Sequence, residues 1–98
     1  MKYVVLFEDN DKFADMRQKH MADHLKFLAE NSDLIDAAGP LKDATSAAAA
    51  GGIWVVECNE TSQVQELVES DPFYPTGLRQ TIRILEWTQV FADGRKLI

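Results

Sequence analysis

Hydrophobic and polar residues recur along the chain with two different periods, and these periods predict the order of strands and helices. The first segment, KYVVLFE at 2–8, is rich in β-branched and aromatic residues and predicts a strand, which Asp9, Asn10 and Asp11 interrupt. From about 12 to 31 apolar side chains recur every three or four positions, which predicts one amphipathic helix. The apolar stripe of this helix consists of Phe13, Met16, Met21, Leu25 and Leu28.

The middle of the chain predicts two more strands. The segment LIDAAGP at 34–40 predicts a short strand that Gly39-Pro40 ends. The small-residue tract ATSAAAAGG at 44–52 predicts a mobile connection, because its paired glycines stop any helical turn that the alanines begin. The strongly apolar GIWVVECN at 52–59 then predicts the third strand.

The last third of the chain predicts a helix, a loop and a strand. Thr61 or Ser62 can begin a helix that ends before Pro72, and DPFYPTG at 71–77 predicts a loop. QTIRILEWTQVF, at 80–91, predicts the last strand. The resulting βαββαβ order is that of an α+β ferredoxin-like fold, with a four-stranded antiparallel sheet and two helices on one face.

Both sides of the predicted strands are apolar, although right-handed crossovers place both helices on the same face of the sheet. In the first strand Tyr3, Val5 and Phe7 alternate with Val4 and Leu6. A solvated face is normally polar, so we predict a homodimer in which two sheets pack face to face. The alternative is that the C-terminal segment at 92–98 covers the face, but it is short and only its last two residues are apolar.

Composition narrows the class of protein. With 98 residues, 46% of them hydrophobic and 27% charged, the chain predicts one folded domain. The net charge of −6 argues against nucleic acid as a partner, because phosphate binding needs clustered Lys and Arg. The chain has no apolar run long enough to span a membrane or to serve as a signal peptide, and its single Cys58 cannot form an internal disulfide. We therefore expect a cytoplasmic protein.

Two histidines, His20 and His24, lie four positions apart in the predicted helix, a spacing that can present two imidazoles to one zinc ion. Met21 stands where the zinc-protease motif has glutamate, and the chain has no third histidine, so we predict no metal site. A catalytic histidine is the second interpretation, because imidazole transfers protons near neutral pH when a carboxylate fixes its tautomer. Helical geometry alone does not choose between the two, and an ordinary helix surface is the third interpretation.

Two other residues have a functional and a structural interpretation. Arg17, one turn before His20, can bind a carboxylate on a ligand or pair with a neighbour such as Asp15 or Asp23. Asp71 precedes a proline at the end of a helix, where aspartate is common for turn reasons alone.

Four segments together resemble the YciI-related (YCII domain) family in their order and spacing. They are HLKFL at 24–28, AAGPL at 37–41, GGIWVVE at 51–57 and DPFYPTGL at 71–78. The resemblance runs from the first strand to the last and implies a single YCII-like domain over 1–98. It also implies the dimeric α/β-barrel fold, which agrees with the plan and the dimer predicted above.

The resemblance implies a His–Asp dyad. The family's helix histidine falls on His24, which opens HLKFL, and the aspartate of its DP motif falls on Asp71. His20 has no counterpart in the family pattern. The connection ENSDLID is shorter than in longer members, and a slip of one turn would give the role to His20.

The resemblance also implies acid–base chemistry on a small cyclic or phenolic compound, since similar proteins are encoded with aromatic-degradation enzymes and include a dehydrochlorinase. We expect elimination, isomerisation or tautomerisation without a metal or organic cofactor, with His24 as general base and Asp71 orienting it. Arg17 and Phe73 are predicted to bind the ligand. Phe73, Tyr74 and Trp54 could supply an apolar wall of the pocket, although a place in the core or the dimer interface is the more ordinary role for each. A non-catalytic ligand-binding or regulatory dimer is the alternative, and a cofactor-free oxygenase is a third.

Overall fold

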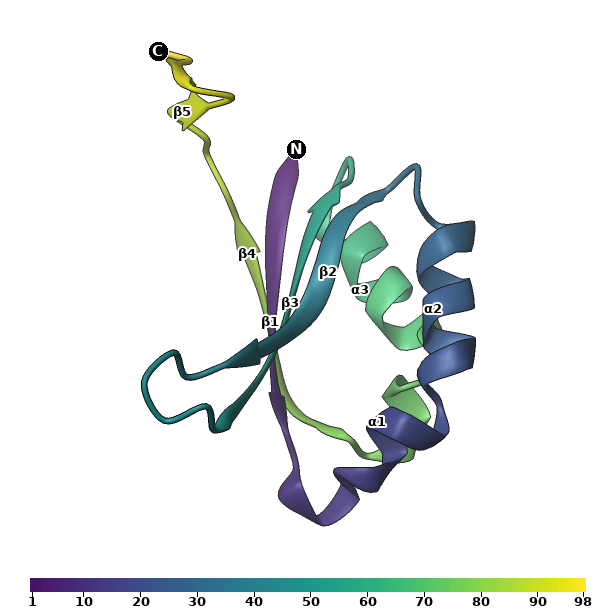
Figure 1. Cartoon of the computed structure of the whole chain (residues 1–98). Coiled ribbons are helices and arrows are strands. Elements are labelled where there is room, and N and C mark those ends of the chain that lie inside the picture. Colours follow the sequence, from purple (N-terminus) through teal and green to yellow (C-terminus); the bar gives the residue numbers. More distant parts are fainter.

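The computed structural model describes residues 1–98 and contains a four-stranded antiparallel sheet with its helices on one face (Figure 1). The strand order is β2-β3-β1-β4, which confirms the predicted α+β ferredoxin-like fold. The elements in chain order are β1 (Lys2–Asp9), the 3-10 turn η1 (Asp11–Phe13), α1 (Asp15–Lys19), α2 (Met21–Glu30), β2 (Ile35–Lys42), β3 (Ala49–Glu57), α3 (Thr61–Ser70), the 3-10 turn η2 (Tyr74–Thr76), β4 (Arg79–Glu86), β5 (Phe91–Ala92) and β6 (Arg95–Lys96).

The core lies between the sheet and the helices. Alternation along β1 buries Tyr3, Val5 and Phe7, and the antiparallel register sets Val5 opposite Trp54 of β3. The buried face of α3 supplies the other side of the core with Val64, Leu67 and Val68. The apolar periods of β1 and α3 thus lead directly to the observed packing.

The opposite face of the sheet, here called the open face, consists of Val4, Leu6, Ile53, Val55 and Leu85. No helix covers it, and the C-terminal residues project away from the sheet in Figure 1. The alternative that the C-terminal segment covers this face is therefore wrong. All five side chains are partly exposed, although four of them belong to the two central strands, β1 and β3.

The predicted single helix over 12–31 is wrong in detail, because the segment forms η1, α1 and α2. His20 joins α1 and α2 with φ −107° and ψ 10°, outside the helical region. The bend lets α1 approach the end of β1 while α2 lies along the sheet (Figure 1). Phe13, in η1, and Leu25, in α2, were both predicted for the buried stripe but are 40% and 56% exposed.

Strand boundaries in the β2–β3 hairpin also differ from the prediction. Pro40 lies inside β2 instead of ending it, which an edge strand tolerates because its outer N–H has no ladder partner. Residues 49–51 of the predicted mobile tract belong to β3. Gly51 has φ +90°, and a Cβ there would lie 1.8 Å from the carbonyl oxygen of Phe7, so only glycine fits this close approach of two strands.

The last predicted strand, 80–91, ends early. Strand β4 stops at Glu86, and the amide of Trp87 makes a final hydrogen bond to the carbonyl of Lys2 at 2.9 Å. The chain then leaves the sheet and forms a two-stranded hairpin, β5–β6, which the sequence analysis missed.

Candidate acid–base site

His24 is the one buried residue of α2, with 7% of its surface exposed. Its imidazole stacks on the ring of Phe73, with centroids 4.1 Å apart and planes inclined by 16°. Its Nδ1 atom lies 2.9 Å from Oδ1 of Asp71. Residues from α2 and from the loop after α3 are thus brought together across 47 positions of sequence.

The carboxylate of Asp71 is held by its own loop. Asp71 ends α3 in an extended conformation, and its Oδ1 accepts a hydrogen bond of 3.0 Å from the amide of Phe73. Its carbonyl accepts a second bond, of 2.8 Å, from the amide of Tyr74. The turn role of aspartate before proline and the contact with His24 therefore occur in the same side chain.

Arg79, which the sequence analysis did not single out, completes a buried network of three residues. Its Nη1 atom donates to Oδ2 of Asp71 at 2.7 Å, and its side chain is 5% exposed. Its guanidinium lies 3.8 Å above the ring of Phe7, where a cation–π contact offsets part of its desolvation. Its sequence context, an arginine at the start of a strand directly after DPFYPTGL, is ordinary and does not indicate this role.

Opposing effects set the ionisation of Asp71 and Arg79. Burial raises the pKa of the Asp71 carboxyl, but the hydrogen bond to His24, the charge of Arg79 and the amide of Phe73 outweigh burial and lower that pKa below its usual value. Burial lowers the pKa of Arg79, and Asp71 opposes this shift. Asp71 is consequently a carboxylate at neutral pH, which accepts the Nδ1 proton of His24 and leaves Nε2 to accept another.

Arg17 lies close to this network on α1. Its Nη2 atom donates to Oδ2 of Asp9 at 2.7 Å, so its partner is neither Asp15 nor Asp23 as the sequence suggested. The other oxygen of Asp9 is buried without a hydrogen-bond partner. Asp9 was interpreted only as a strand end, and nothing in its sequence context distinguishes it from the acidic residues beside it.

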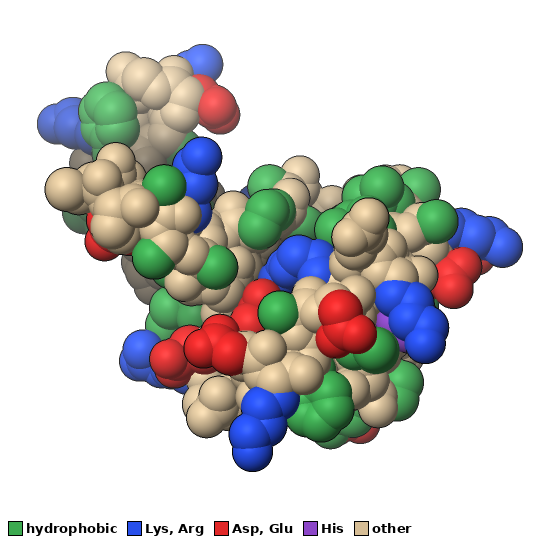
Figure 2. All heavy atoms as spheres, turned by 60° about the horizontal axis from the view of Figure 1, so that its bottom comes forward, with side chains coloured by type: hydrophobic (Ala, Val, Ile, Leu, Met, Phe, Trp, Pro, Cys, Tyr) green, Lys and Arg blue, Asp and Glu red, His purple; other side chains and the backbone are tan.

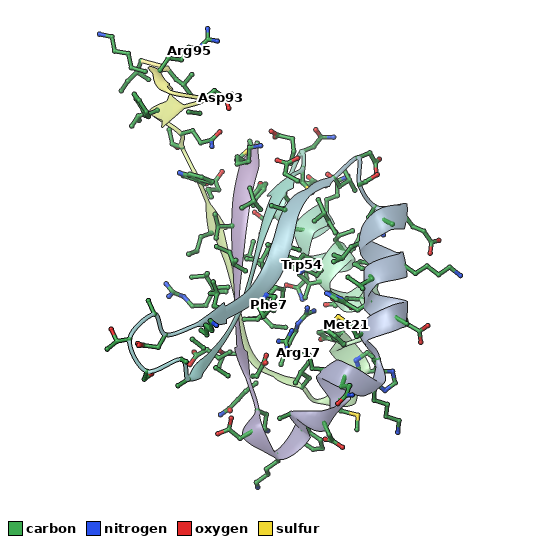
Figure 3. All side chains as sticks on the ribbon, in the orientation of Figure 1. Phe7, Arg17, Met21, Trp54, Asp93 and Arg95 are labelled. Carbon is green, nitrogen blue, oxygen red and sulfur yellow. The ribbon has the colours of Figure 1, made fainter.

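A pocket opens between the helices and the β1–β3 part of the sheet. Figure 3 shows Arg17 and Met21 from the helices pointing toward the same space as Phe7 and Trp54 from the sheet. Its volume is about 100 Å³, room for several waters or one six-membered ring. The pocket is lined by Phe7, Arg17, Met21, His24, Leu25, Leu28, Ala38, Gly39, Pro40, Gly52, Ile53, Trp54 and Arg79.

The pocket is mainly apolar, and the charged side chains in its wall are two arginines. Asp9 and Asp71 neutralise these arginines from behind and do not line the space. The whole molecule has a net charge of −6, and Figure 2 shows acidic side chains beside basic ones at its front surface. The pocket thus favours a flat apolar ring with a negatively charged or electron-rich oxygen.

Of the three aromatic residues that could supply an apolar wall, two lie outside the pocket. Phe73 is fully buried behind His24, so it does not line the pocket as a ligand contact; its ring fixes the imidazole instead. Tyr74 is 41% exposed and also lies outside the pocket. Trp54 does line it, packed edge-on against Phe7 with centroids 5.1 Å apart.

His20 does not share the surroundings of His24. It is half-buried at the junction of α1 and α2 and does not line the pocket. No three His, Cys, Asp or Glu side chains lie close enough together to bind a metal ion. His20 is the N-cap residue of α2, and its carbonyl accepts a hydrogen bond of 3.0 Å from the amide of His24.

Comparison with known proteins agrees with the fold. A family model described as the YCII-related domain matches residues 1–88. Over 87 residues the chain is 30% identical to the uncharacterized protein YjpA of Bacillus subtilis (strain 168). The alignment covers 87% of this chain and 92% of that protein.

Solved structures with the same fold come from a bacterium and a plant. The 5-chloro-2-hydroxyhydroquinone dehydrochlorinase TftG of Burkholderia phenoliruptrix AC1100, in complex with 2,5-dihydroxybenzoquinone, has a TM-score of 0.79 and 24% identity over 90% of this chain and 94% of that one. A hypothetical protein of Arabidopsis thaliana has a TM-score of 0.53 and 14% identity over 94% of this chain and 89% of that one.

None of the helices combines the length and the apolar character needed to cross a membrane.

Proposed function

Because the chain belongs to the YCII-related domain family, we propose that it is an enzyme of acid–base chemistry on a small cyclic or phenolic compound, with His24 as proton acceptor. The observation that carries this proposal is the buried hydrogen bond between His24 and Asp71 at the edge of a pocket. Asp71 positions the imidazole and stabilises its charged form, and Arg79 keeps Asp71 ionised.

In an elimination, Nε2 of His24 takes a proton from a carbon or oxygen of the ring. The electrons of the broken C–H or O–H bond form a new double bond. The leaving group departs with the electron pair of the bond that joined it to the ring. The negative charge that develops on a ring oxygen lies near Arg17 and Arg79, which stabilise it. Isomerisation and tautomerisation use the same first step and return the proton to a different atom, and none of these reactions requires a cofactor.

The size and character of the pocket support a single ring as substrate. Phe7 and Trp54 supply flat apolar walls, and the arginines supply the charge that an ionised phenol or enol needs. The structural neighbour TftG is a dehydrochlorinase in complex with a dihydroxybenzoquinone, a ligand of this kind. Dehydrochlorinase-like elimination is therefore our first choice of reaction.

We further propose that the protein acts as a homodimer joined through the open face. A shallow apolar depression on this face is lined by Val4, Ile53, Val55, Leu85 and Trp87. An exposed apolar patch on one face of a sheet is typical of a protein–protein interface. The predicted packing of two sheets remains the simplest way to remove it from water.

Chloride release from 5-chloro-2-hydroxyhydroquinone and proton exchange of phenols and lactones in D₂O, followed by NMR, test the proposed activity. We expect His24→Ala to lower the rate by about 10²–10⁴, while His20→Ala, the matched control four positions earlier at the junction of α1 and α2, changes it little. Equal rates for the wild type and His24→Ala would contradict the proposal.

The second candidate is a ligand-binding module without turnover. The complete satisfaction of Asp71 by His24, Arg79 and the Phe73 amide favours it, because the same network is a stable structural unit. In that case 2,5-dihydroxybenzoquinone binds, as followed by tryptophan fluorescence, but the protein converts neither 5-chloro-2-hydroxyhydroquinone nor any of the phenols and lactones.

A further inference from the structure

The last twelve residues, 87–98, form a projection that we call the C-terminal arm. Strands β5 and β6 pair as a hairpin, Phe91 with Lys96 and Ala92 with Arg95. Asp93 and Gly94 form its two-residue turn with φ of +54° and +77°, the combination that a type I′ turn requires. The arm is thus a regular β-hairpin. Figure 3 shows its labelled Asp93 and Arg95 far from the labelled pocket residues.

The arm has almost no hydrogen bonds with the body of its own chain. The bond from the Trp87 amide to Lys2 is the last one, and the amide of Leu97 bonds within the arm to the carbonyl of Val90. A two-stranded hairpin alone is marginally stable in water. The arm therefore needs a surface to pack against.

Much of the arm is apolar and faces water. Its large exposed apolar side chains are Trp87, Val90, Phe91, Leu97 and Ile98. Phe91 is 62% exposed, more than any other aromatic side chain of the protein. Such a cluster is typical of a segment that is buried in a complex.

The position of the arm selects the partner. Figure 1 shows that the arm leans to the side of the sheet opposite the helices, which is the side of the open face, and the tip of the β2–β3 hairpin projects to that side as well. Trp87 belongs both to the arm and to the apolar depression on the open face, so the two apolar surfaces are continuous. A second copy that packs on the open face lies within reach of the arm. Two-fold symmetry then places the arm of each copy against the other copy.

Charge favours the same partner. The arm holds two of the chain's ten Lys and Arg and one of its sixteen Asp and Glu, which gives its side chains a net charge of +1 and the rest of the chain −7. The apolar depression itself has an acidic residue, Glu86, in its wall. A net-positive arm is attracted to the acidic body of another copy.

We propose that the C-terminal arm of one copy packs against the open face of a second copy, with Phe91 as its main apolar contact. This inference rests on the sheet-face dimer proposed above and does not depend on the proposed chemistry. The arm would then contribute to dimer formation and make this contact only in the dimer.

Mixed dimers of ¹³C-labelled and unlabelled full-length chains test the contact directly. We expect isotope-filtered NOEs between the ring of Phe91 in one copy and methyl groups of Val4, Val55 or Leu85 in the other. NOEs from this ring only within its own chain, or none in a dimeric sample, would overturn the proposal while leaving the sheet-face dimer intact. A wild-type chain that stays monomeric at NMR concentration overturns both.

Sedimentation velocity measures the contribution of the contact. Phe91→Ser should raise the dimer dissociation constant by about 10-fold or more, since burying an aromatic side chain contributes on the order of 1.5–3 kcal/mol. Phe91→Leu keeps an apolar side chain and should restore most of the affinity. Phe91 lies outside the core, so circular dichroism should show folded variants, and equal dissociation constants for all three proteins contradict the arm contact.

Discussion

Nδ1 of His24 and Oδ1 of Asp71 lie 2.9 Å apart in a place where neither side chain has much contact with water. The second carboxylate oxygen of Asp71 is occupied by Arg79, so the aspartate holds one cation and one imidazole at once. Each partner limits what the other can do. Arg79 keeps Asp71 from taking the imidazole's proton, and Asp71 keeps Nε2 of His24 as the site that gains a proton.

The first prediction concerns stability and pH. Because the pKa of Asp71 is lowered by folding, its ionised form stabilises the protein above the unfolded-state pKa of about 3.9, and this contribution is lost as the pH falls through the folded-state value. Asp71→Asn leaves Arg79 buried without a charge partner and should lower the free energy of unfolding by about 3–5 kcal/mol at pH 7.

Urea unfolding of the wild type and Asp71→Asn between pH 7 and pH 3 checks this. The difference in unfolding free energy should be largest at neutral pH and should begin to shrink below about pH 4, because the carboxyl of the unfolded chain then binds a proton that the folded carboxyl, with its lowered pKa, does not yet bind. Asp33→Asn, at an exposed position, is the control and should show little difference at any pH. A constant difference across the range contradicts the assignment of the charge to Asp71.

The fold could be predicted from the sequence because its main signals are local. The alternation in β1 and the apolar stripe of α3 survive into the structure, and the order of elements leaves few topologies. The bend at His20 was missed because both short helices are compatible with the same stripe of apolar residues. In the structure α1 is joined to the end of β1 by the hydrogen bond from Arg17 to Asp9, a contact that the apolar stripe does not predict.

The candidate site also contains residues that a local sequence motif indicates and residues that no local motif indicates. His24 and Asp71 came from motifs of the family, and the structure brings them together; their catalytic role stays a prediction. Arg79 and Asp9 carry no local signal, since an arginine in a strand and an aspartate in an acidic turn are both ordinary. Their importance arises from long-range contacts, to Asp71 and to Arg17 respectively.

The second prediction concerns the affinity of the pocket for an anionic ring. Arg17 lines the pocket, and a charge-assisted hydrogen bond contributes about 1.5–3 kcal/mol. Arg17→Gln should therefore weaken binding of 2,5-dihydroxybenzoquinone by about 10-fold or more, as measured by calorimetry. Lys19→Gln removes the same charge from an exposed position of α1 and serves as the control. Equal losses in both variants would assign the effect to net charge alone.

The third prediction concerns the close approach of β3 to β1. A Cβ at Gly51 would lie 1.8 Å from the backbone oxygen of Phe7, and the φ of +90° is also unfavourable for alanine. Gly51→Ala should destabilise the protein by roughly 3 kcal/mol or more, because backbone atoms of a central strand must move. Gly39→Ala meets no atom within 4 Å and should change the unfolding free energy little. Similar urea midpoints for both variants would show that the strands do not approach in this way.

The fourth prediction concerns the open face. Leu85, which is 37% exposed, lies in the apolar depression of this face, and in a sheet-to-sheet dimer an aspartate there would have to be buried without a partner. Leu85→Asp should shift the protein to monomer at micromolar concentration in sedimentation velocity. Leu25→Asp places the same charge on the helical side, at a leucine that is 56% exposed, and should remain dimeric. A wild type that is already a stable monomer, or a Leu85→Asp variant that dimerises as tightly as Leu25→Asp, refutes the interface.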